Sequence, residues 1–97
     1  MTDDDRFRYN LRTIRELLVI SYNAVDLHAL IAYDQELHPL RYEFADSDSI
    51  LVLADKTIDF CIRRLLMDHL LLLVADDRPA QYARFEGELR VDREGKA

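Results

Sequence analysis

Residues 49–64, SILVLADKTIDFCIRR, carry the clearest helical pattern of the chain. Apolar side chains recur there every three or four positions, at Ile50, Leu51, Ala54, Ile58, Cys61, Ile62 and, just beyond, Leu65. The positions between them hold the charged side chains Asp55, Lys56, Asp59 and Arg63. This spacing is typical of an α-helix with one buried face. The preceding run of Ser and Asp residues offers N-caps, so we expect a central helix that starts at Ser49.

Three shorter helices are predicted before this central helix. The first covers residues 10–21, with Asn10 as its N-cap and a buried stripe of Phe7, Leu11, Ile14, Leu17 and Leu18. Asn23 is expected to cap the second, whose buried face is Leu27, Leu30 and Ile31. Pro39 suits the first position of a helix, and it predicts a short third helix over residues 39–44.

Two helices are predicted after the central one. A single helix over residues 49–75 would be long for a globular protein, so we expect a break at residues 65–67. The fifth helix would then begin with Asp68 as a possible cap and bury Leu70, Leu71 and Val74. Pro79 opens the sixth, which carries Tyr82, Phe85 and Leu89 on one face, and the charged tail from Val91 is expected to fray.

The composition supports one all-α domain. The 97 residues are 49% hydrophobic and include only two Gly and two Pro, too few turn-formers for a sandwich of many strands. The formal net charge of −6 opposes binding to nucleic acid, which leaves a helix-turn-helix of the second and third helices as a weak alternative. A lone cysteine and an acidic first segment without a signal-peptide pattern indicate a cytoplasmic protein. No apolar run approaches the ~20 residues of a membrane span, so we expect no membrane partner.

The residues that carry chemistry do not form a recognisable catalytic or metal-binding motif. His28, His38, His69 and Cys61 are zinc-ligand types, but their spacing does not preorganise a site. Cys61 falls on the apolar stripe and is expected in the core. We therefore predict a protein that is not an enzyme and has no cofactor. A small helical sensor that binds a ligand or metal is the alternative.

Charge placement suggests an interaction surface instead. Arg8, Arg12 and Arg15 are spaced to line one side of the first helix, while Asp34 and Glu36 end the second. Opposite patches on one small domain suit head-to-tail association, although a solvated helix surface would show the same pattern.

Three blocks carry a family resemblance. They are LRTIRELLVISYNAVDLHALI at residues 11–31, SILVLADKTIDFCIRR at residues 49–64 and MDHLLLLVADDRPAQYARF at residues 67–85. In order and spacing they resemble the bacterial effector-associated domains, in particular the seventh type, which are members of the death-like fold superfamily. The chain departs from that pattern at Leu65, where the family tends to have Gly, and at Tyr22, where Phe is usual.

The resemblance implies a compact six-helix death-fold-like bundle over residues 11–89, with an N-terminal segment at 1–10 and a polar tail at 90–97. It implies a non-catalytic adaptor that associates with itself or with like domains on effector or NTPase proteins, in bacterial defence or programmed death. Death-fold assemblies set the first and fourth helices against the second and third of a neighbour. That geometry would place Arg8, Arg12 and Arg15 against Asp34, Glu36 and Glu43.

Overall fold

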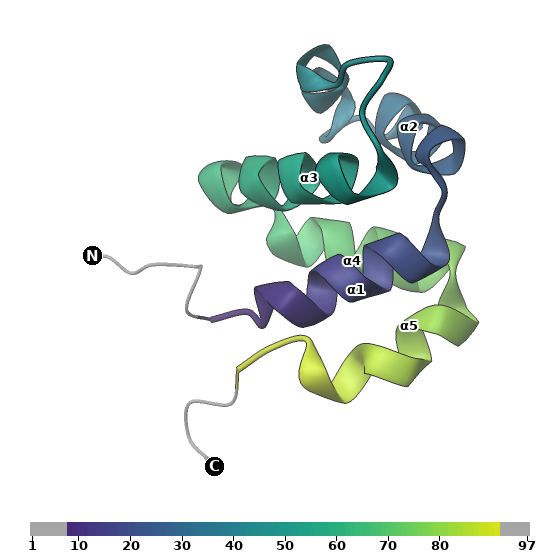
Figure 1. Cartoon of the computed structure of the whole chain (residues 1–97). Coiled ribbons are helices and arrows are strands. Elements are labelled where there is room, and N and C mark those ends of the chain that lie inside the picture. Colours follow the sequence, from purple (N-terminus) through teal and green to yellow (C-terminus); the bar gives the residue numbers. More distant parts are fainter. Residues whose placement is uncertain (1–7, 92–97) are drawn as a thin grey trace.

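The computed structural model describes residues 8–91, which form an all-α bundle (Figure 1). In chain order the elements are α1 (Leu11–Ser21), α2 (Ala24–Tyr33), the 3₁₀-helix η2 (His38–Glu43), α3 (Ile50–Arg64), α4 (Met67–Asp77), α5 (Pro79–Phe85) and the 3₁₀-helix η3 (Glu86–Glu88). Because η3 continues α5 without a gap, the six predicted helical segments are confirmed. Phe7, predicted on the first stripe, lies outside the described residues.

Two of the four predicted N-caps, Asn23 and Ser49, make the expected hydrogen bond. The Asn23 side chain accepts a hydrogen bond from the Asp26 N–H at 2.7 Å, and Ser49 Oγ accepts from the Val52 N–H at 3.3 Å. Each bond satisfies a backbone donor that the first helical turn leaves without a partner. Asn10 precedes α1 as predicted, but its side chain makes no capping hydrogen bond.

The predicted break between α3 and α4 is confirmed at Leu65. This residue takes the left-handed conformation, with φ 60° and ψ 39°. The Leu66 N–H donates to the Cys61 carbonyl at 2.8 Å, and α4 begins at the next residue. The expectation that Asp68 caps α4 is wrong: it lies inside the first turn, and its carboxylate accepts from Tyr9 and Arg90 instead.

The core forms around α3, which runs antiparallel to α1 and also packs against α2, η2 and α4 (Figure 1). Ala54, Ile58, Cys61 and Ile62 are buried as predicted, together with Ile14, Leu17 and Leu18 of α1. The predicted face is wrong at Leu51, which is 44% exposed, and at Leu65, and Ile50 is only partly buried. Leu53, Thr57 and Phe60 are buried instead. Because neighbours cover α3 on several sides, its buried arc is wider than one stripe.

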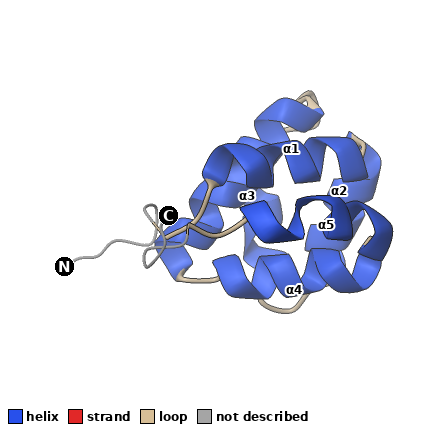
Figure 2. Cartoon of the chain, turned by 90° about the horizontal axis from the view of Figure 1, so that it is seen from below, coloured by secondary structure: helices blue, strands red, loops and turns tan. Residues whose placement is uncertain are grey.

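The two described ends of the chain are joined side by side. The Asn10 N–H donates to the Leu89 carbonyl at 2.9 Å, and the Val91 N–H donates to the Arg8 carbonyl at 3.0 Å. Tyr9 is buried at this bridge, so the folded unit includes residues on both sides of the predicted 11–89 span. From below, α4 and α5 lie next to each other, and α5 also packs on α1 (Figure 2).

Candidate interaction surfaces

The predicted basic side chains of α1 face carboxylates from α3. Arg15 Nε donates to Asp55 Oδ1 at 2.6 Å across the two helices. Arg12 and Arg15 line a shallow groove of about 280 Å³ whose other wall includes Asp55 and Asp59. No ion pair joins Arg12 to any residue within 8–91. Arg8 is exposed and precedes α1, at the bridge between the two ends of the chain.

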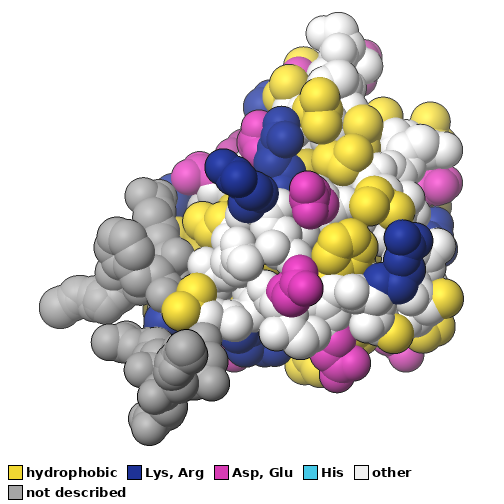
Figure 3. Space-filling view, turned by 60° about the horizontal axis from the view of Figure 1, so that its bottom comes forward, with side chains coloured by type: hydrophobic (Ala, Val, Ile, Leu, Met, Phe, Trp, Pro, Cys, Tyr) yellow, Lys and Arg dark blue, Asp and Glu magenta, His cyan; other side chains and the backbone are white. Residues whose placement is uncertain are grey.

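The groove between α1 and α3 therefore has balanced charge, because α3 supplies as many carboxylates as α1 supplies guanidiniums. The face of the molecule drawn in Figure 3 likewise intersperses acidic and basic side chains with apolar ones. The spacing of arginines within one helix gave no information on the charges of the helix that packs beside it.

Of the predicted acidic residues, Asp34 is bound within the fold. Its side chain is 12% exposed, and Oδ2 accepts from the backbone N–H groups of Glu36 at 3.1 Å and Leu37 at 3.0 Å. His69 Nε2 of α4 lies 2.8 Å from the same oxygen. Asp34 thus shapes the turn after α2 and ties it to α4.

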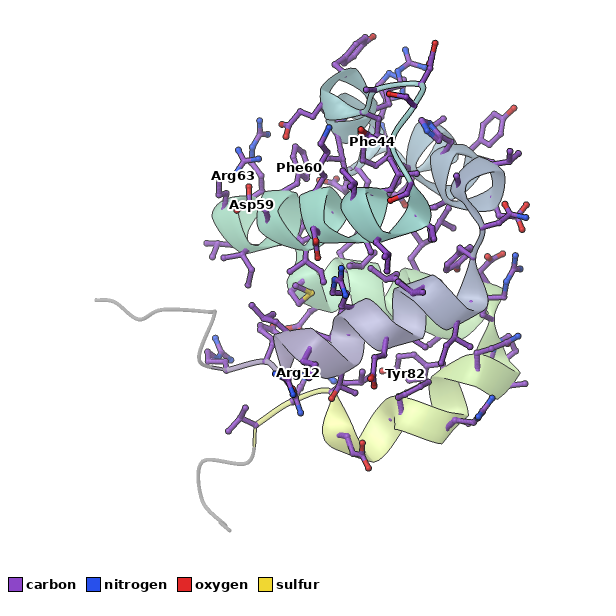
Figure 4. All side chains as sticks on the ribbon, in the orientation of Figure 1. Arg12, Phe44, Asp59, Phe60, Arg63 and Tyr82 are labelled. Carbon is purple, nitrogen blue, oxygen red and sulfur yellow. The ribbon has the colours of Figure 1, made fainter. Side chains whose placement is uncertain are left out.

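The other two acidic residues differ in their surroundings. Glu36 is exposed, and its carboxylate makes no ion pair with the described residues. Glu43 lies 3.2 Å from Nη2 of Arg63, whose Nε also donates to Asp59 at 2.9 Å. Figure 4 shows that Arg63 and Phe60 lie on the side of α3 that faces away from α1.

Exposed tyrosines on α2 and η2 form a further candidate surface. Tyr33 is 89% exposed and Tyr42 is 74% exposed. They border an open groove of about 540 Å³, which we call the tyrosine groove; its lining is His28, Ala29, Ala32, Tyr33, Arg41, Tyr42, Phe44 and Asp46. Tyr33 lies two residues after the buried Ile31, so its side chain is turned about 200° around the helix from that of Ile31. This spacing is the sequence signal for the exposure of Tyr33.

Ring contacts order the tyrosine groove. The His28 and Phe44 rings meet edge to face, with centroids 5.0 Å apart. The Arg41 guanidinium lies 4.9 Å from the centre of the Tyr42 ring, and its Nη2 donates to the Tyr42 hydroxyl at 2.9 Å. These contacts hold an aromatic surface open to solvent.

A third groove, between α2 and the junction of α4 and α5, is acidic. We call it the acidic groove; it holds about 370 Å³ and is lined by Asp26, Ala29, Leu30, Tyr33, Asp34, Leu73, Asp77 and Arg78. Three carboxylates against one guanidinium leave an excess of two negative charges around an apolar floor.

Arg78 and Tyr22 fix one end of the acidic groove. Arg78 Nε donates to the Ser21 carbonyl at 3.0 Å, and its guanidinium stacks 4.7 Å from the centre of the Tyr22 ring. The Tyr22 hydroxyl donates to Asp77 Oδ2 at 2.9 Å. Burial and this hydrogen bond to a carboxylate raise the pKa of Tyr22.

Neither Cys61 nor a cluster of metal-ligand side chains forms a reactive site in the described residues. Cys61 is fully buried, as predicted, and burial, with a smaller effect of Asp34, raises the pKa of its thiol to about 12. A thiol in that state is a poor nucleophile at neutral pH. In the described part of the chain, no three His, Cys, Asp or Glu side chains gather closely enough to hold a metal ion.

Within residues 8–91, no helix is both long enough and apolar enough to span a membrane. Comparisons of the chain with family models, with curated proteins and with solved structures find no match.

Proposed function

We propose that this chain is a non-catalytic protein-interaction domain that associates with a second copy or with a like domain on another protein. The observation that carries the proposal is the exposure of Tyr33 and Tyr42 on neighbouring elements. Tyrosine combines a large apolar ring with a polar tip, and it is enriched at protein interfaces and their energetic centres. Tyr9 and Tyr22, in contrast, are buried and donate to carboxylates of their own chain.

The resemblance to bacterial effector-associated domains supports this proposal and extends it. A death-like module of that kind would recruit effector or NTPase proteins through matching copies, in a cytoplasmic defence or programmed-death system. The six-segment all-α bundle is compatible with such a module.

The charged residues have a secondary part in the proposed contact. Arg15, Asp34 and Glu43 already bind partners within the fold, whereas Arg12 and Glu36 make no ion pair with residues 8–91. Charges at the rim of an interface contribute more to encounter rate and orientation than to affinity. The tyrosine groove supplies the apolar contact, and the charged faces orient it.

The test compares the oligomeric state of two variants. Light scattering from micromolar to millimolar concentration is expected to show assemblies for the wild-type chain and monomers for Tyr33→Ala/Tyr42→Ala. Both side chains are exposed, so helical content and thermal melt stay unchanged. The control is Leu72→Asn, which removes a similarly exposed apolar side chain from α4 and keeps assembly intact. A wild-type chain that stays monomeric and captures no like domain contradicts the proposal.

A further inference from the structure

Leu65 occupies a position that normally favours glycine. The turn after α3 closes with the Leu66 N–H bound to the Cys61 carbonyl at 2.8 Å and the Leu65 N–H bound to the Ile62 carbonyl at 3.4 Å. This is the Schellman arrangement, in which the left-handed residue is usually Gly because a Cβ is unfavourable there. Among the described residues, Leu65 alone has a positive φ.

The Leu65 side chain contributes little to the packing of the fold. Leu65 is 74% exposed, and Leu66 makes the apolar contact with the core that accompanies this kind of helix end. An unfavourable backbone conformation that supports no packing is an indication of function. The left-handed conformation of Leu65 therefore suggests that its side chain contacts another molecule.

The residue that precedes Leu65 is an arginine. Arg64 has its guanidinium 4.8 Å from the centre of the Phe60 ring and makes no ion pair with residues 8–91. Leu65 and Arg64 thus form a tip that combines an exposed leucine with an unneutralised cation. The acidic groove has the complementary character, an apolar floor of Ala29, Leu30 and Leu73 beside excess negative charge.

We propose that the Leu65 tip of one copy docks into the acidic groove of a second copy. The leucine would cover the apolar floor, and Arg64 would approach the carboxylates of Asp26 and Asp77, which share a single guanidinium, that of Arg78, within their own chain. The C-terminal end of α3, which carries the tip, and the junction of α4 and α5, which borders the acidic groove, lie at opposite ends of the bundle (Figure 1). The contact is therefore head to tail and can extend to further copies. This inference rests on the proposed function and specifies its partner and its docking residue.

Leu65→Asn tests the tip without endangering the fold. Asparagine tolerates the left-handed conformation, so the variant is expected to melt no lower than the wild type. Light scattering should show self-association weakened by about tenfold or more, as for a central interface residue. Leu72→Asn is the matched control, because it removes a comparably exposed leucine outside both surfaces and leaves association unchanged.

A complementation experiment tests the pairing itself. Asp26→Lys reverses a charge of the acidic groove at an exposed helical position that does not line the tyrosine groove. Neither this variant nor Leu65→Asn should assemble alone, whereas an equimolar mixture should form a dimer through the one intact tip and the one intact groove.

Each outcome separates the two proposals. If Leu65→Asn assembles as the wild type does, or if the mixture stays monomeric, the docking mode is overturned. Loss of assembly in Tyr33→Ala/Tyr42→Ala alone would then leave the proposed function standing. If the wild-type chain binds a like domain but does not bind a second copy of itself, the proposal that a second copy occupies the acidic groove is wrong. If it binds neither, both proposals are wrong.

Discussion

Phe60→Ala is the sharpest test of how α3 packs. Phe60 is 1% exposed, on the side of α3 that faces away from α1 (Figure 4). Removing a buried phenylalanine ring usually destabilises a protein by about 3–5 kcal/mol, through lost apolar burial and the cavity that remains. The ring also lies 4.8 Å from the Arg64 guanidinium and 5.8 Å from that of Arg63, and each such contact adds about 0.5–1 kcal/mol.

Urea denaturation followed by circular dichroism measures this loss. A total of about 4–7 kcal/mol approaches the whole stability of many small domains, so Phe60→Ala is expected to be largely unfolded. Phe60→Leu keeps most of the volume and should lose only about 1–1.5 kcal/mol, which remains measurable. Arg64→Ala isolates the contribution of one guanidinium. If Phe60→Ala lost less than about 1 kcal/mol, the wide buried arc assigned to α3 would be wrong.

Three further predictions concern charge and backbone conformation. Hydrogen bonds from Arg90 and Tyr9 lower the pKa of Asp68, so the stability that this carboxylate contributes is complete above pH 3.8 and is lost as the pH falls through the lower folded-state pKa. In Asp68→Asn, the urea midpoint should therefore change less than in the wild type between neutral pH and strong acid. Arg15→Glu sets a second carboxylate against Asp55 and should lower stability by about 0.5 kcal/mol in low salt, and an effect that added salt does not reduce would refute the pairing. Leu65→Gly relieves about 1–2 kcal/mol of backbone strain but gives the unfolded chain about 0.4–1 kcal/mol of entropy, so the melt should stay level or rise slightly, and a clear fall would contradict the strain argument.

Helix boundaries were predictable because their causes lie within a few residues. Ser49 bonds to a backbone group three positions away, and the break at Leu65 follows from the length and phase of its own segment. The roles of Arg15 and Asp34 depend on partners that are far away in the sequence. Asp55 and His69 reach them only after the helices have packed.

Burial on α3 shows the same limit. A one-sided periodic pattern identifies the face toward a single neighbour, and it correctly predicted that Ile58 and Cys61 are buried. It did not predict the burial of Phe60, because α3 also packs against η2, α2 and α4 and is therefore covered on more than one side. The charged candidates for an interface were visible in the sequence, whereas the grooves are made by pairs of helices and exist only in the fold.

The bridge between the two ends also determines how the domain responds to mechanical load. Tension applied through residues 8 and 91 acts across an antiparallel pair whose ends leave in the same direction. Its two backbone hydrogen bonds, Asn10 to Leu89 and Val91 to Arg8, are therefore peeled one after the other instead of being sheared together. Tyr9 and Arg90 hold the peeled strands to a common carboxylate, Asp68. Because the ends already meet, a short linker between them would also permit a circular permutant with new ends elsewhere on the surface.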